Sequence, residues 1–150
     1  PTERALSHYF HQSRKGRESL PVTEALQGEE ARLAPVLAEH HYKHQNFMHF
    51  SYKLRGHYAE QIRRYQALFP AENLLILGSE QFFADPHAAL KKVFEFVGVD
   101  ASFQVPNLQA RNVGSNRKSV QADVYQYLKD YFEPHNEELY QLLGERFGWE

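Results

Sequence analysis

The polar residues among the first eleven positions have the types and spacing of an anion-binding site. Arg4, Ser7, His8 and His11 follow i, i+3, i+4, i+7 spacing, which places them on one face of a helix. A guanidinium, a hydroxyl and two imidazoles near a helix start suit an anionic ligand, of which phosphate is one example. Proline is favourable at a first helical position, so Pro1 fits this helix.

A second polar cluster, Ser115-Asn116-Arg117-Lys118-Ser119, follows Gly114. Arginine can bind two oxygens of a phosphate at once, whereas lysine supplies a compact charge. Backbone amides around Gly114 and Ser115 could add further donors. The cluster is either a phosphate-binding loop or a solvated basic loop.

Four histidines, His40, His41, His44 and His49, raise a metal hypothesis. On a helix, His40 and His44 would share one face, and imidazole is a common zinc ligand. No cysteine and no His-Glu-x-x-His motif accompanies them, so we favour a core or substrate-side role over a metal site.

Composition indicates one folded domain. The chain has 150 residues, of which 42% are hydrophobic and 14% aromatic. A net charge of −2 gives no indication of nucleic-acid binding, and no apolar run approaches the roughly 20 residues of a membrane helix. The absence of cysteine excludes disulfides and thiolate chemistry within these residues.

The hydrophobic pattern predicts a mostly helical chain with one evident strand. After the opening helix, residues 13–18 form a loop, and residues 22–39 are helical, with Pro35 kinking or dividing the stretch. Further helices are expected over 58–69, over 86–97 and, on either side of Glu133-Pro134, in the C-terminal segment. The strand, residues 73–77, cannot form a sheet alone, so its partners are expected elsewhere.

The pattern Pro-x-x-Arg-Ala-x-Ser-x-Tyr of residues 1–9 resembles the 3′-phosphate-binding segment of sulfotransferases that depend on PAPS (3′-phosphoadenosine 5′-phosphosulfate). Later segments resemble the same family in the same order, closest to its heparan-sulfate-type and bacterial branch. They are Gly56-His57-Tyr58, Leu74 to Leu77 with Glu80, Asp85-Pro86 with Phe94-x-x-Val97-Gly98, Pro134-His135-Asn136, and Leu143-Gly144 with Trp149.

This resemblance implies an α/β fold with a central parallel sheet flanked by helices. It also implies that residues 1–150 are the C-terminal part of a single sulfotransferase domain. The phosphosulfate loop and the usual catalytic base would then lie upstream of Pro1.

The resemblance also implies roles for individual residues. Ser7 would bind the 3′-phosphate of PAPS, with Arg4 and the loop residues Ser115, Arg117 and Lys118, and His11 would lie near the sulfate acceptor. Each residue has an ordinary alternative. Ser7 and His11 would be exposed helical residues, and Arg4 would form a structural ion pair.

The implied reaction is in-line transfer of a sulfuryl group from PAPS to a hydroxyl or amine, without metal, releasing 3′-phosphoadenosine 5′-phosphate (PAP). The acceptor could be a glycan, a lipid, a metabolite or a carrier-bound intermediate. We expect a cytoplasmic bacterial protein, because Golgi-lumen sulfotransferases commonly carry a disulfide and this chain has no cysteine. The alternative is a non-catalytic helical module that binds a protein partner.

Overall fold

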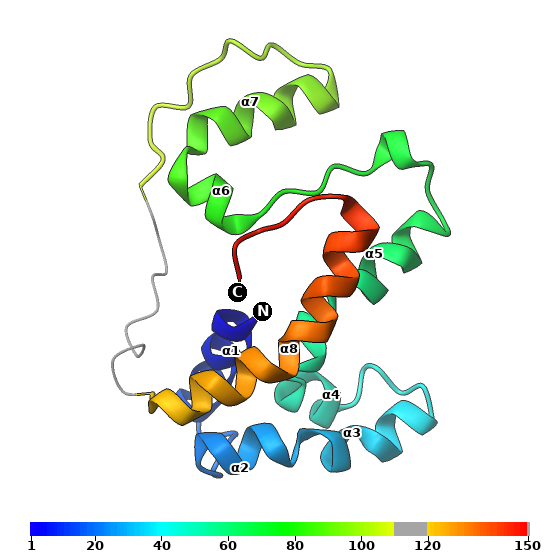
Figure 1. The fold of residues 1–150 in the computed structure, drawn as a ribbon, viewed down its shortest axis with the longest axis vertical. Helices are drawn as coiled ribbons and strands as arrows, with labels where there is room; N and C mark the ends of the chain where they lie inside the picture. The colour runs from blue at the N-terminus through cyan, green and yellow to red at the C-terminus, as the bar shows by residue number, and fades with distance from the viewer. Residues whose placement is uncertain (110–119, 150) are drawn as a thin grey trace. The chain divides into compact units, whose positions relative to one another are not determined.

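The computed structural model describes residues 1–109 and 120–149. It divides into two compact units, one formed by Pro1–Gln61 with Gly114–Glu150 and the other by Ile62–Val113. All regular structure within the described residues is helical (Figure 1). The expectation of a single domain stays a prediction.

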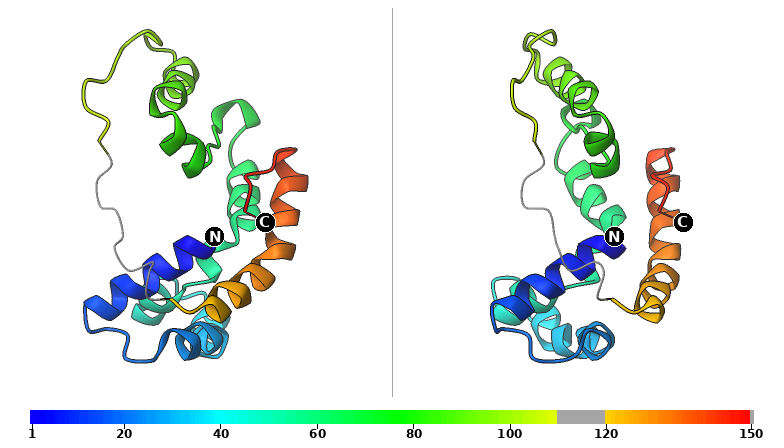
Figure 2. Two further views of the ribbon diagram at one scale, coloured as in Figure 1. Left: turned by 60° about the vertical axis from the view of Figure 1, so that its left-hand side comes forward. Right: turned by 90° about the vertical axis from the view of Figure 1, so that its left-hand side faces the viewer.

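The first unit is a cluster of short helices completed by one long C-terminal helix. Helix α1 contacts α4, the 3-10 turn η1 and α8, and α3 packs against α4 (Figure 2). Its elements are α1 (Thr2–Arg14), α2 (Val22–Gln27), α3 (Glu29–Ala38), α4 (Gln45–Phe50), η1 (Leu54–Gly56), the start of α5 (Tyr58–Gln66), and α8 (Ala122–Leu143).

The buried core of this unit joins α1, α2 and α8. Burial of these apolar side chains is the main force that holds the helices together, because most helical stability in proteins comes from packing of an apolar face. The core consists of Ala5, Leu6, Tyr9, Ala25, Leu26, Tyr52, Val124, Leu128 and Phe132.

The opening helix is confirmed, with two differences. It continues to Arg14, so the predicted loop at Ser13 begins too early. His8 is only 8% exposed, so it lies with the buried side chains and not on the predicted polar face. The 100° step between helical residues brings His8 close to the edge of the apolar stripe, and the neighbouring segment covers it.

The chain breaks at Gly28 instead of Pro35. Helix α2 ends before Gly28, α3 begins after it, and Pro35 lies inside α3. Burial of Leu33 and Val36 on either side of Pro35 favours the continuous helix over the loss of one backbone hydrogen bond.

The two predicted C-terminal helices are one helix. Helix α8 runs from Ala122 to Leu143 with Pro134 inside it. Phe132, Asn136 and Leu139 are all buried, so one face of the helix packs continuously across the proline. Tertiary packing overrides the local breaker here.

The second unit contains the end of α5, the turn η2 (Ala71–Asn73), α6 (Ser79–Ala84) and α7 (Pro86–Val97), with α6 packed on α7. Helix α7 confirms its predicted ends. Asp85 Oδ1 accepts a hydrogen bond from the Ala88 N–H at 2.9 Å, and Gly98 closes the helix in the left-handed conformation at φ 74°.

The predicted strand is wrong for the described residues. Residues 74–77 form no strand, and Leu75 and Ile76 are 38% and 37% exposed, so the segment is not buried either. An extended segment becomes a strand only when a neighbouring strand accepts and donates its backbone hydrogen bonds. The central sheet is therefore not confirmed.

Candidate anion-binding site

Helix α1 presents three of the predicted site residues to solvent. Arg4, Ser7 and His11 are exposed, because Ala5, Leu6 and Tyr9 fix the opposite face of the helix in the core. The other predicted ligands, Ser115, Arg117 and Lys118, lie outside the described residues. Of the predicted site residues, the structure therefore brings together only those on α1, which are Arg4, Ser7 and His11.

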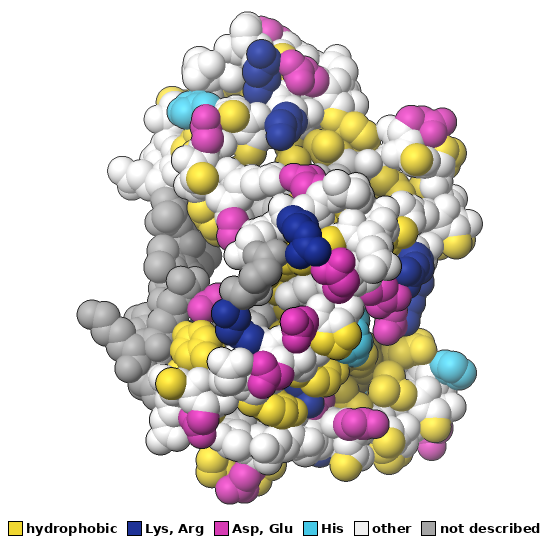
Figure 3. Space-filling view, viewed as in Figure 1, with side chains coloured by type: hydrophobic (Ala, Val, Ile, Leu, Met, Phe, Trp, Pro, Cys, Tyr) yellow, Lys and Arg dark blue, Asp and Glu magenta, His cyan; other side chains and the backbone are white. Residues whose placement is uncertain are grey.

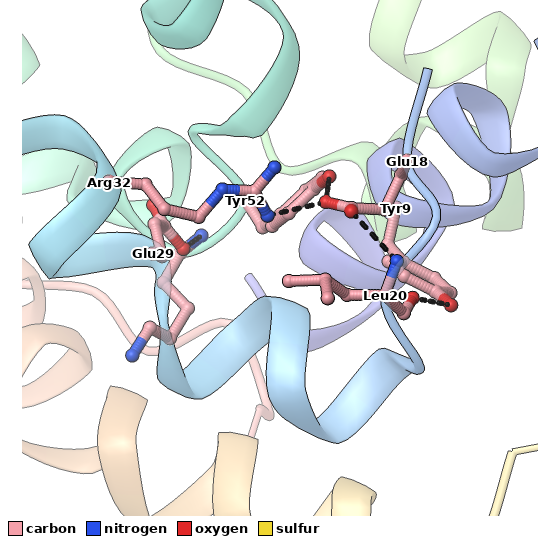
Figure 4. A network of polar contacts seen from close by, with 7 residues as sticks. Tyr9, Glu18, Leu20, Glu29, Arg32 and Tyr52 are labelled. Atoms are coloured by element: carbon pink, nitrogen blue, oxygen red, sulfur yellow. Dashed lines mark hydrogen bonds and ion pairs between the residues drawn. The ribbon is translucent and has the colours of Figure 1, made fainter. Parts of the chain in front are cut away.

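A buried polar network fixes the segment that follows α1 (Figure 4). Glu18 Oε2 accepts hydrogen bonds from Arg32 Nη1 and from the Tyr52 hydroxyl, both at 2.6 Å, and Glu18 Oε1 accepts from the Leu20 N–H at 3.1 Å. The Tyr9 hydroxyl donates to the Leu20 carbonyl at 2.9 Å. The network ties α1, α3 and the residue Tyr52 to one carboxylate.

The protonation of Glu18 follows from these contacts. Burial opposes ionisation, but the hydrogen bonds from Arg32 and Tyr52 outweigh it and lower the pKa of Glu18. Glu18 is therefore a carboxylate at neutral pH. Loss of either donor would leave a buried charge partly unsatisfied.

A second buried carboxylate, Glu29, holds the start of η1. Glu29 Oε2 accepts from the Lys53 N–H at 2.7 Å and Oε1 from the Leu54 N–H at 3.0 Å. Burial is the largest influence on this group and raises the pKa of Glu29. Together, the bond from the Tyr52 hydroxyl to Glu18 and the bonds from the Lys53 and Leu54 amides to Glu29 hold the backbone of residues 52–54 in place.

That backbone places Arg55 beside α1, which the sequence analysis did not predict. The Arg55 guanidinium donates to Ser51 Oγ from Nε at 3.1 Å and to the Met48 carbonyl from Nη2 at 2.9 Å. Burial, and then the charge of Arg4, lower the pKa of Arg55. No spacing pattern marks this residue, because its neighbours come from a separate helix.

His8 lies beneath this region as a neutral imidazole. Burial, followed by the charges of Arg55 and Arg4, lowers the pKa of His8 from 6.5 to about 4. Its Nε2 atom is buried and finds no hydrogen-bond partner within residues 1–109 and 120–149.

His11 is exposed and surrounded by positive charge. The charge of Lys15, then slight burial, then Arg14, Arg17 and Arg4 lower the pKa of His11 below 6.5. At neutral pH the imidazole is therefore mostly uncharged and can accept a proton.

The histidines at 40–49 do not form the helix face expected for a metal site. His40 has a positive φ of 51°, and His44 is the N-cap of α4, where its Nδ1 accepts from the Asn46 N–H at 3.1 Å. No group of three or more possible ligands that could hold a metal ion is found among the described residues.

The tyrosines of α8 make polar contacts as well as packing contacts. Lys53 Nζ donates to the Tyr127 hydroxyl at 2.8 Å, and His57 Nε2 lies 2.9 Å from the Tyr131 hydroxyl. The His57 and His135 rings stack with centroids 3.9 Å apart. These contacts fasten η1 and the start of α5 to α8.

A cavity of about 240 Å³ lies along α8, and none of the predicted site residues line it. Trp149 at its wall stacks on Phe147, with ring centroids 5.0 Å apart. The lining includes Gln126, Asp130, Glu137, Tyr140, Arg146 and Trp149.

Acidic and basic side chains intermingle on the molecular face shown in Figure 3. No described helix is both long and apolar enough to cross a bilayer.

Comparison with known proteins identifies the class of protein to which this helical chain, with its exposed polar face on α1, belongs. The sulfotransferase domain family matches residues 1–140. The chain therefore belongs to the sulfotransferase domain family.

A solved structure agrees with this assignment. The crystal structure of a sulfotransferase from Alicyclobacillus acidocaldarius superposes on this chain with a TM-score of 0.74 at 27% sequence identity. The match covers 99% of this chain and 53% of the bacterial chain. The predicted family resemblance is confirmed.

Relatives identified by sequence include glycan-modifying enzymes. Mouse heparan sulfate glucosamine 3-O-sulfotransferase 3B1 is 24% identical over 117 residues, which is 63% of this chain and 30% of the relative. The membrane-associated sulfotransferase kil1 of Dictyostelium discoideum is 29% identical over 93 residues, or 62% of this chain and 19% of the relative. The chain thus spans less than a third of either relative.

Proposed function

We propose that this chain contributes the 3′-phosphate side of a PAPS-dependent sulfotransferase. The whole enzyme transfers a sulfuryl group from PAPS to a hydroxyl or amine and releases PAP. The observation that carries the proposal is the exposed Arg4–Ser7–His11 face of α1, within a chain whose family is sulfotransferase. A hydroxyl and a guanidinium are groups that bind phosphate oxygens.

In this proposal Ser7 and Arg4 hold the 3′-phosphate, and Ser115, Arg117 and Lys118 add contacts from the segment that precedes α8. The central sheet and the phosphosulfate loop belong to the whole enzyme. Fixing the donor in one orientation is the main contribution of such residues, because sulfuryl transfer requires in-line alignment.

His11 faces the acceptor in this proposal and takes its proton. Its lowered pKa supports this role, since only the neutral imidazole can act as a base. The heparan sulfate acceptor named for the mouse relative makes a glycan hydroxyl or amine the first acceptor to test.

The experiment is calorimetric titration of PAP into this chain and into any longer natural form that carries residues upstream of Pro1. We expect Ser7→Ala to weaken PAP binding about tenfold, because one hydrogen bond to a charged group is lost. Ser19→Ala, which removes another exposed hydroxyl, is the matched control and should leave the affinity unchanged.

A well-folded longer form that binds no PAP would overturn the proposal. That result would favour the non-catalytic helical module, which predicts no nucleotide affinity in either form. Adenosine 5′-phosphate differs from PAP only by lacking the 3′-phosphate, so the difference between the two affinities gives the contribution of that phosphate to binding.

A further inference from the structure

Arg55 is held in one orientation by neutral groups alone. Its Nε donates to Ser51 Oγ and its Nη2 to the Met48 carbonyl, at 3.1 and 2.9 Å. No ion pair to Arg55 occurs among the residues that the structure describes. Two neutral acceptors orient a guanidinium but do not neutralise its charge, so the group remains able to bind an anion.

The η1 turn packs directly on the first turn of α1. A Cβ atom placed on Gly56 would lie 3.0 Å from Pro1 Cβ, so the two backbones are in close contact. This contact packs the turn that carries Arg55 against the first turn of α1, which carries the exposed Arg4. Arg4 likewise has no ion pair in the described part of the chain. The charge of Arg4 acts on Arg55 more strongly than the opposing charge of Glu29 does.

A third polar group lies below this pair. His8 is 8% exposed, and its Nε2 has no partner among the described residues. The surrounding charge is consistent with this arrangement, since Arg55 and Arg4 both act on His8 to keep it neutral. Like charges placed together on a folded surface are destabilising unless a bound anion compensates them.

We propose that Arg55 and Arg4 form a binding site for a tetrahedral oxyanion, a chemistry shared by the phosphate of a nucleotide and the sulfate of an acceptor. Arg55 is the pre-oriented arm of this site, and Arg4 is the exposed arm that closes on the ion. The assignment of the oxyanion to the sulfuryl donor or to the sulfate acceptor rests on the proposed function. The binding of an oxyanion by Arg55 and Arg4 does not.

Inorganic sulfate is the probe for the site itself. Sodium sulfate is titrated into the chain at constant ionic strength, balanced with chloride, and the Nε–Hε resonances of the arginines are followed by NMR. We expect saturable binding that Arg55→Gln weakens about tenfold, because the anion loses its oriented donor. Lys43→Gln removes an exposed charge elsewhere and should leave the sulfate affinity unchanged.

Arg4→Gln is the second variant, because its side chain is exposed and its loss cannot unfold the chain through packing. It should weaken sulfate to a similar extent. Equal sulfate affinity in wild type, Arg55→Gln and Arg4→Gln, or no saturable binding by the folded wild type, overturns the inference.

Two further titrations identify the source of the oxyanion. Loss of PAP affinity in Arg55→Gln with unchanged affinity for adenosine 5′-phosphate assigns the site to the 3′-phosphate. Unchanged nucleotide affinity with weaker binding of a sulfated oligosaccharide assigns it to the acceptor. If wild type binds sulfate through Arg55 but no form binds PAP, the oxyanion site stands and the proposed function fails.

Discussion

The Tyr52 hydroxyl donates a 2.6 Å hydrogen bond to Glu18 Oε2, and so joins two residues 34 positions apart in the sequence. Arg32 binds the same oxygen at 2.6 Å, so one carboxylate connects the end of α1 to α3 and to the segment before η1 (Figure 4). This connection fixes Arg55 relative to α1, and the stability of the candidate site depends on it.

Glu18→Gln should lower the free energy of unfolding by about 2–3 kcal/mol, because Arg32 and Tyr52 lose a charged acceptor in a mostly buried site. Tyr52→Phe should cost about 1–2 kcal/mol. Since the pKa of Glu18 is lowered, its contribution is present above pH 4.5 and disappears as the pH falls below that value. Urea unfolding measures each variant.

A double-mutant cycle completes this test. The combined Glu18→Gln and Tyr52→Phe variant should be more stable than the sum of the single effects predicts, because both changes remove the same hydrogen bond. Glu24→Gln, which changes an exposed side chain of α2, is the control, with an effect within about 0.5 kcal/mol. Strict additivity would show that the Glu18–Tyr52 contact carries no coupling.

Gly56→Ala should destabilise the chain by about 1–3 kcal/mol through overpacking. A Cβ at this position would lie 2.5 Å from Phe132 Cε1 and 3.0 Å from Pro1 Cβ, so α8 or α1 must move. Thermal unfolding followed by circular dichroism measures the change. Adding Phe132→Leu should recover part of the stability that Gly56→Ala loses. If the double variant loses as much stability as the two single variants together, or more, the overpacking is not against Phe132.

His8 should make the chain sensitive to acid. Its pKa is about 4 in the folded chain and 6.5 in the unfolded chain. As the pH drops, the unfolded chain therefore binds the proton first, and the free energy of unfolding falls between pH 6.5 and about pH 4. The full effect is about 3 kcal/mol. Unfolding free energies across this range should have a shallower pH slope in His8→Gln, and the same slope as wild type in the exposed His87→Gln control.

His11 should set the acid limb of the rate profile in an active form of the protein. Its lowered pKa places that limb below pH 6.5, and kcat/KM should fall as the imidazole becomes protonated. His11→Gln should reduce kcat by about 10²-fold or more and remove this limb. PAP release from PAPS measures the rate. An unchanged profile would assign the proton transfer to another residue.

Several elements follow from local sequence. Asp85 and Gly98 fix the ends of α7 because a side-chain cap and a left-handed glycine act over three or four residues. The helical spacing of α1 likewise predicts the exposure of Arg4, Ser7 and His11. The family resemblance needed no tertiary information, since it rests on ordered short motifs along the chain.

Other predictions failed where distant contacts outweigh local preference. Pro134 lies inside α8 because Phe132 and Asn136 are buried on either side of it, and residues 74–77 form no strand because no described strand pairs with them. Local patterns contain the preference of a segment, but not the presence or absence of its neighbours.

The sequence by itself determined the family, the polar face of α1 and the helix ends with strong caps, because these depend on residues a few positions apart. Only the tertiary structure decided that His8 is buried and neutral, that Glu18 meets Tyr52, and that the charge of Arg4 acts on Arg55. Burial and electrostatic interaction depend on distance in space, and folding brings residues together that no spacing along the chain relates.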